Sequence, residues 1–269
     1  MATSSTDTSD IRSAMLDRDE EQEEDGRARM SFLEHLDELR RRIIHALYFV
    51  AAGCVISFTF VAKIQDFLLR PLQALIPNGG KLIATEVGEL FMFQLKLGFL
   101  VGLIIAMPGV LLQFWLFIAP GLYAREKRYA VPFVVSSSLL FFAGAWFCHV
   151  YAFPWTWKFF MSFSNDVVQN APTVSNTFGF YVKMVLAFGA VFQMPVIVFV
   201  LARFGIVTAH FLWVKGKYAI LIIFIVAAVA SPGTDVVSQM MMAAPMILLY
   251  GMSIVVAWLF GKKRKPATV

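Results

Sequence analysis

Two glutamates ahead of the first long apolar block have a spacing that could bind a cation. Glu34 and Glu38 stand four positions apart, so on a helix they would lie one above the other. Two like charges at this spacing destabilise a helix by a few tenths of a kcal/mol, and a bound cation would remove that cost. The alternative is an ordinary solvated ion pair, because Glu38 precedes Arg42, and Asp37 precedes Arg41, by the favourable four positions. The spacing leaves both interpretations open.

A third glutamate, Glu126, is the only acid in the polar segment of residues 119–128. This segment separates two later apolar blocks. Arg125 and Lys127 flank the glutamate, so its simplest role, taken alone, is that of a local counter-ion.

Other polar side chains lie within or beside the apolar blocks. Gln113, Gln193 and Gln239 are uncharged, and amides in such surroundings stabilise membrane helices by hydrogen bonding across them. Asp235 follows residues 231–234, Ser-Pro-Gly-Thr, directly before the last apolar block. An aspartate there is typical of a helix N-cap, which accepts a hydrogen bond from a free amide of the first turn.

The sequence contains no arrangement typical of an enzyme. Its four histidines are scattered, and its two cysteines each lie inside an apolar block, where a thiol behaves as a small hydrophobe. We find no metal-ligand spacing, no nucleophile beside a base, no phosphate loop and no dinucleotide fingerprint. We therefore predict no catalytic residues, no metal site and no cofactor. The residues considered are His35, His45, His149, His210, Cys54 and Cys148.

The elements that carry these residues are membrane helices. Hydrophobic residues make up 59% of the 269 positions and charged residues only 15%, whereas a soluble domain has about 25% charged residues. The apolar residues fall in blocks sized to a bilayer. The prediction is an all-α polytopic membrane protein with six transmembrane helices, at about Ile43 to Ala62, Leu97 to Phe117, Tyr129 to Phe153, Phe178 to Leu201, Tyr218 to Ala230 and Val237 to Phe260.

The fifth predicted span is short. The residues between Lys217 and Ser231 give about 20 Å of helix, against a hydrocarbon core of about 30 Å. We expect the mismatch to be met by Lys217 reaching to the interface, by helical residues upstream such as Trp213, or by locally thinned lipid.

Three regions follow from this division. Residues 1–29 form an acidic tail without apolar periodicity, for which we expect disorder. Residues 30–261 form the six-helix membrane domain, beginning at Ser31 with the S-x-x-E spacing of a capping box. Residues 262–269 form a basic tail. Between the first two spans, Ile64, Phe67 and Leu68 predict a short helix along the interface.

Basic residues predict the orientation. One side carries four clusters of lysine and arginine, at residues 40–42, 125–128, 203–217 and 262–265. The other side has Lys63, Arg70, Lys81 and Lys158. The positive-inside rule therefore puts both termini in the cytoplasm. The basic residues are explained by topology and by contact with lipid headgroups, and no basic stripe suited to nucleic acid remains.

Several motifs in order resemble the TatC family, the receptor subunits of the twin-arginine protein translocase. Residues 32–40 resemble its H-L-x-E-L-R signature, with His35, Glu38 and Arg40 at matching positions. Residues 113–126 resemble its Q-x-W-x-F-I-A-P-x-L-x-x-x-E segment, which includes Phe117, Pro120 and Glu126. The resemblance runs from about Ser31 to Phe260, and its further matches are Pro71, Ile83 to Glu86, Pro132 with Ser136 to Ser138, and Pro232 to Gln239.

The resemblance implies a function. Members of the family bind the signal peptides of folded proteins through two glutamates, matched here by Glu38 and Glu126, with Phe117 close by and His35 and Arg40 in the same motif. It also implies transport driven by the proton gradient in a bacterial or archaeal cytoplasmic membrane. Position 193 is often acidic in this family and is Gln here, so we assign no protonation step to it.

The resemblance further implies partners. These are TatA and TatB, single-span proteins that dock near the fifth and sixth helices, where Ser231, Gln239 and Gln193 would provide polar contacts. A homo-oligomer within the complex is also expected, and Pro71, Pro120 and Asp235 would be structural. The alternative class is a secondary transporter, which needs charged residues near the midplane. Only Lys96 and Lys183 could supply them, and both could reach the outer interface.

Overall fold

The computed structural model describes residues 34–73, 82–118, 130–163, 172–231 and 235–261. Within these ranges the chain is helical, apart from turns and one isolated β-bridge between Ile83 and Thr173. Several predicted features lie outside the described residues: the acidic and basic tails, the cap at Ser31, Pro120 and Glu126.

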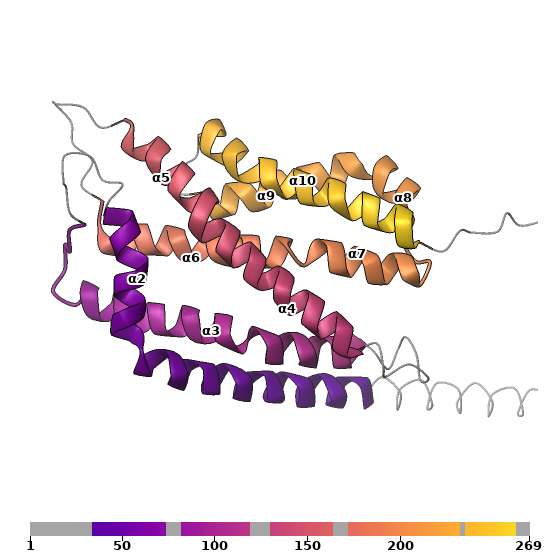
Figure 1. Ribbon diagram of the computed structural model, residues 1–269, viewed down its shortest axis with the longest axis horizontal. Helices are drawn as coiled ribbons and strands as arrows, with labels where there is room; N and C mark the ends of the chain where they lie inside the picture. The colour runs from indigo at the N-terminus through magenta and orange to yellow at the C-terminus, as the bar shows by residue number, and fades with distance from the viewer. Residues whose placement is uncertain (1–33, 74–81, 119–129, 164–171, 232–234, 262–269) are drawn as a thin grey trace, which may run out of the picture.

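In the described ranges, six helical elements run between the two ends of the bundle, and Figure 1 shows how they are arranged. Five of the six are long and apolar enough to cross a membrane, and α9 is shorter. The prediction of an all-α protein with six spans is confirmed. The elements are the first helix (Glu34–Thr59), α3 (Glu89–Ile118), α4 (Ala130–Phe147) with η4 (Cys148–Ala152) and α5 (Phe153–Met161), α6 (Val174–Val191) with α7 (Met194–Arg203), α9 (Gly216–Ala230), and α10 (Val236–Phe260).

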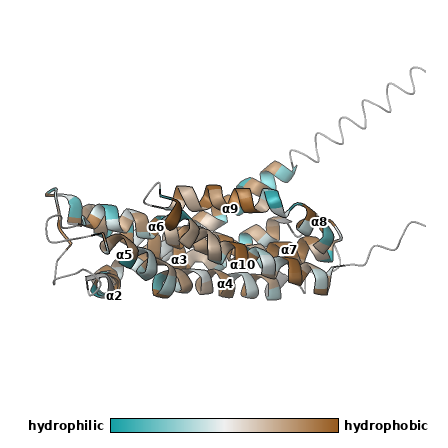
Figure 2. Ribbon diagram, turned by 90° about the horizontal axis from the view of Figure 1, so that it is seen from above, coloured by the Kyte–Doolittle hydropathy of each residue, from teal (hydrophilic) through white to brown (hydrophobic). Residues whose placement is uncertain are grey.

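The helices extend further at one end of the bundle than the hydrophobic blocks predict. α3 begins at Glu89 instead of Leu97, and the third element continues to Met161 instead of Phe153. The reason is that a helix continues past the hydrocarbon region, where its sequence becomes mixed and hydropathy no longer marks it. The start of the first helix and the end of α10 lie together at the opposite end, at the right of Figure 1. Hydrophilic residues gather toward both ends (Figure 2).

The predicted interfacial helix is present as α2 (Val61–Gln73). It follows the first helix after a turn at Phe60 and runs crosswise to it (Figure 1). Leu68 is buried and Ile64 is half-buried, whereas Asp66 and Arg70 are exposed. This division between an apolar and a polar face is what a helix lying along a membrane surface requires.

Glycines let the first helix approach α3 closely. Gly98 and Gly102 have the G-x-x-x-G spacing that brings membrane helices together. A Cβ atom added to Gly102 would lie 2.7 Å from the Cα of Cys54 on the first helix, and one added to Gly98 would overlap the ring of Phe58. Gly109 receives the ring of Phe49 in the same way. We call this contact the glycine seam.

The centre of the bundle is α6, which packs against α3, α4, α9 and α10. Its Met184 and Phe188 are fully buried. The element is interrupted at Gln193, where Pro195 follows and has no N–H to continue the helical ladder. The third element instead continues through the π-helical turn η4, where the His149 ring stacks on Phe67 of α2 at 5.2 Å between centroids.

The fifth span is short in the structure as well. α9 has 15 residues, or about 22 Å of helix. Trp213 is helical, as predicted, but it belongs to a separate short helix, α8 (Ala209–Val214), and Lys215 leaves helical geometry between the two.

Candidate signal-peptide site

Aromatic and charged side chains join the first helix to α3 at the end of the bundle where the first helix begins. The ring of His35 stacks on that of Phe117, with centroids 4.6 Å apart and planes 24° from parallel. One turn further along the first helix, Glu38 Oε1 accepts a hydrogen bond from Arg42 Nη2 at 3.2 Å. Arg42 Nη1 also donates to Gln113 Oε1 of α3, at 3.4 Å. Glu38, Arg42 and Gln113 thus form a small polar network beside the stacked rings.

The Glu38 carboxylate remains accessible. Its side chain is 31% exposed and that of Arg42 29%, so water screens the ion pair, and such pairs contribute about 0.2–1 kcal/mol. Glu38 Oε2 accepts no hydrogen bond from any residue in the described ranges. Among the described residues, the carboxylate therefore has one oxygen engaged and one without a partner.

The structure brings some of the predicted site residues together. His35, Glu38 and Phe117 lie at one end of the first-helix and α3 pair. Arg40 is exposed on the first helix. Glu126 and Pro120 lie outside the described residues. Pro71 is within α2.

The three predicted glutamine contacts all cross between helices. Gln113 accepts from Arg42, Gln193 Nε2 donates to the carbonyl of Ser137 on α4 at 3.1 Å, and Gln239 Nε2 donates to the carbonyl of Phe224 on α9 at 2.8 Å. The Ser137 hydroxyl also accepts from the Trp115 indole at 2.8 Å. Gln193 thus stabilises the interrupted element by binding it to α4.

A polar cluster closes the turn between α9 and α10. Asp235 Oδ2 caps α10 by accepting from the Ser238 amide at 2.8 Å, and Oδ1 accepts from the Ser238 hydroxyl at 2.8 Å. The Ser231 hydroxyl lies 2.8 Å from that of Ser238. Because the single Ser238 proton goes to Asp235, Ser231 must be the donor to Ser238. The hydrogen bonds that Asp235 accepts from Ser238, chiefly the one from the amide, hold the pKa of the Asp235 carboxyl below its usual value.

Glu89 is a polar residue that the sequence analysis missed. Its side chain is 7% exposed, and its carboxylate accepts from the Thr85 amide and from the Ser175 amide, both at 2.6 Å, and from the Thr85 hydroxyl at 3.1 Å. The β-bridge between Ile83 and Thr173 lies beside it. We call this contact the Glu89 clasp. The T-x-x-x-E spacing of Thr85 and Glu89 could have indicated their hydrogen bond, but no sequence pattern indicated the contact between Glu89 and Ser175.

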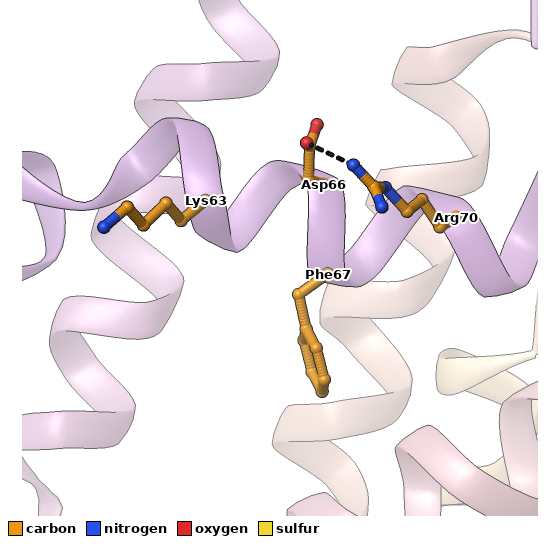
Figure 3. Close-up of a pocket in the computed structure, with 4 residues that line it drawn as sticks. All are labelled: Lys63, Asp66, Phe67 and Arg70. Atoms are coloured by element: carbon orange, nitrogen blue, oxygen red, sulfur yellow. Dashed lines mark hydrogen bonds and ion pairs between the residues drawn. The ribbon is translucent and has the colours of Figure 1, made fainter.

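A shallow surface pocket lies on α2, away from the network of Glu38. It is lined by Lys63, Asp66, Phe67 and Arg70 (Figure 3). Arg70 pairs with Asp66 at 3.0 Å, and both side chains are largely exposed. Among the described residues, no group of three or more His, Cys, Asp or Glu could hold a metal ion. The pocket contains no catalytic arrangement.

Six bundle-crossing helices, joined by amide and hydroxyl contacts, define a polytopic α-helical membrane protein. Comparison with known sequences gives the family. Residues 34–245 match the family TatC, described as Sec-independent protein translocase protein. The chain belongs to the TatC family.

Related sequences are similar to this one over most of its length. The Sec-independent protein translocase protein TatC of Desulforapulum autotrophicum is 43% identical, over 87% of this chain and 86% of its own length. That of Koribacter versatilis is 44% identical, over 88% of each chain. A crystal structure described as twin arginine translocase receptor TatC matches with a TM-score of 0.76 and 36% identity, covering 83% of this chain and 97% of that one.

Proposed function

We propose that this protein is the receptor and core subunit of a twin-arginine translocase, and that Glu38 binds an arginine of the signal peptide. The observation that carries the site is the accessible Glu38 carboxylate, one oxygen of which has no partner among the described residues, beside the stacked rings of His35 and Phe117. The likeness to a crystal structure of a twin arginine translocase receptor, and to relatives that are Sec-independent protein translocase proteins, supports the receptor role.

Arginine fits this site better than lysine for geometric reasons. A guanidinium is planar and can donate two parallel hydrogen bonds to a carboxylate, whereas a lysine ammonium acts as a point charge. A hydrogen bond to a charged group contributes about 1.5–3 kcal/mol when shielded, and less at the exposure seen for Glu38. Glu126 is proposed as the second carboxylate, so that two neighbouring arginines are bound together. His35, Phe117 and Arg40 are proposed as the surrounding contacts.

TatA and TatB are proposed to dock at α9 and α10. α9 packs only on α6, α8 and α10 among the described helices with substantial contacts, and it leaves a broad apolar face exposed. Ser231, Gln239 and Gln193 are the proposed polar contacts for these partners. The short α9 is proposed to thin the adjacent lipid. The exposed apolar residues of α9 include Leu221, Ile222, Ile225 and Val229.

The proposed location is a bacterial or archaeal cytoplasmic membrane, with the start of the first helix and the end of α10 on the cytoplasmic side. The described basic residues within 40–42 and 203–217, at this end, support that orientation. Transport would be driven by the proton gradient, without a cofactor, and a homo-oligomer within the complex is proposed.

A secondary transporter is supported less well. Such a protein needs charged residues that face a pathway inside the bundle, but Lys96 and Lys183 are both exposed on its surface. Uptake of small solutes into liposomes containing the protein would test this alternative.

The deciding experiment measures binding of an Arg-Arg signal peptide to the detergent-solubilised full chain, with a Lys-Lys peptide as control. Glu38→Gln and Glu126→Gln should each weaken binding. Glu34→Gln is the matched control, because Glu34 is one turn away and exposed. Equal binding of the two peptides to the unaltered protein would overturn the receptor role. Unchanged binding in both variants would overturn the two carboxylates.

A further inference from the structure

We infer that Arg42 is an internal competitor for Glu38, which a signal-peptide arginine must displace, and that Gln113 holds Arg42 once it is displaced. The inference rests on the proposed function, since it concerns how that site is occupied before the ligand arrives. It assigns Arg42 and Gln113 a role in setting the affinity of the site.

The network leaves Arg42 incompletely satisfied. A guanidinium has five N–H donors. Among the described residues, Arg42 forms two hydrogen bonds, to Glu38 Oε1 at 3.2 Å and to Gln113 Oε1 at 3.4 Å. Its Nε is buried and has no hydrogen-bond partner among the described residues. Both bonds are long for a charged donor, for which about 2.7–2.9 Å is usual. This arrangement is weak enough to be exchanged for a better one.

The competitor and the proposed ligand carry the same chemical group. While Arg42 occupies Oε1, its charge offsets that of Glu38, and an incoming guanidinium can reach only Oε2. A two-bond contact between the ligand and Glu38 requires Arg42 to leave Oε1. Such a contact aligns both pairs of atoms, so exchange replaces one long hydrogen bond by two parallel ones.

Gln113 makes the exchange possible without leaving Arg42 unpaired. Arg42 is partly buried, and a partly buried charge that loses its partner destabilises the protein. Gln113 is 7% exposed and fixed within α3, so its carbonyl oxygen stays available to Arg42 throughout. It lies one helical turn from Phe117, which stacks on His35. Arg42 therefore moves between two acceptors at the edge of the proposed site.

Competition by Arg42 keeps the affinity of the site for the signal peptide below its maximum. Without Arg42 the carboxylate would present its full charge and both oxygens to the ligand. With Arg42 it releases the ligand more readily, which a receptor that must pass its cargo onward requires. Removing Arg42 should raise affinity by about twofold to fivefold, the range that a partly exposed ion pair corresponds to.

The experiment compares Arg42→Gln with Arg41→Gln. Both variants remove one positive charge from the same turn, but in the structure only Arg42 donates to Glu38 and Gln113. The dissociation constant of an Arg-Arg signal peptide is measured on the full chain in detergent. Arg42→Gln should bind about twofold to fivefold more tightly than Arg41→Gln. Equal or weaker binding by Arg42→Gln would overturn the inference.

A second variant is expected to act in the opposite direction. Gln113→Met keeps the side-chain length but removes the alternative acceptor, so displacing Arg42 becomes costlier and peptide affinity should fall. The effect should vanish in the double variant with Arg42→Gln. A fall of equal size in the double variant would contradict the role given to Gln113.

Failure of the inference and failure of the proposed function are distinguishable. If the unaltered protein does not prefer Arg-Arg over Lys-Lys peptides, or if Glu38→Gln binds normally, the proposed site is wrong. If that preference and the Glu38 effect are both present but Arg42→Gln matches Arg41→Gln, only the competition is wrong.

Discussion

The ring of His35 stacks on the ring of Phe117 at 4.6 Å between centroids, joining the first helix to α3. The contact lies beside the network of Glu38, Arg42 and Gln113. Because Glu38 and Phe117 come from different helices, the geometry of the proposed site depends on how these helices are held together.

Phe117→Leu should weaken signal-peptide binding by loosening this contact. An aromatic pair contributes about 0.5–1.5 kcal/mol beyond its buried area, which corresponds to roughly a twofold to tenfold loss. Phe114→Leu is the control, because Phe114 lies on the same helix and packs against Trp115 instead. Photo-crosslinking of an Arg-Arg peptide would measure the effect. A loss of the same size in both variants would mean that the stack has no specific role.

Gly102→Ala should destabilise the protein through the glycine seam. The added methyl would stand 2.7 Å from the Cα of Cys54, and overpacking of this kind costs about 1–3 kcal/mol. Gly179→Ala in α6 is the matched control, because nothing lies within 4 Å of its added methyl. Alanine there should be neutral or slightly stabilising. Thermal unfolding in detergent would separate the two, and equal midpoints would contradict the seam.

Glu89→Ala should free the chain segments joined by the Glu89 clasp. The amides of Thr85 and Ser175 would lose their shared acceptor, and hydrogen exchange at both should accelerate. Glu86→Ala is the control, since the exposed Glu86 contributes only its backbone amide to the clasp. Protection that persists at Ser175 in Glu89→Ala would show that the β-bridge alone holds the two segments.

The Asp235 cap should contribute stability that does not change between pH 5 and 8. Its pKa is lowered from 3.8 by the Ser238 amide and hydroxyl, so the ionised form is the one that folding favours. The contribution is complete above about pH 3.8 and is lost as pH falls through the lower pKa of the folded state. Unfolding midpoints of the unaltered protein and of Asp235→Asn should differ by a constant amount at pH 5–8 and converge below. A gap that narrows between pH 8 and 5 would assign the dependence to another group.

The sequence predicted those features that depend on local pattern. The interfacial helix α2 was readable because Ile64, Phe67 and Leu68 repeat on one face, and the cap of α10 because an aspartate precedes an apolar block. The three glutamines were correctly expected to bond across helices, since amides in an apolar block have few other partners.

The remaining features depend on contacts between distant residues. Glu89 accepts a hydrogen bond from Ser175, which is 86 positions away, and no local spacing predicts such a contact. The start of α3 and the end of α5 were missed because each helix continues beyond the residues that are strongly hydrophobic. The ion pair of Glu38 and Arg42 is the ordinary interpretation that the spacing had left open, and only the structure added Gln113 as the third member.

The glycine seam has a mechanical consequence. Because the first helix and α3 are in contact through backbone atoms, we expect them to move as one rigid pair. The first helix has 26 residues, so the pair is about 39 Å long. The proposed peptide site lies at one end of this pair and α2 extends from the other (Figure 1). If a ligand bound at Glu38 tilted the first helix together with α3, the tilt would therefore displace α2 at the opposite end of the bundle.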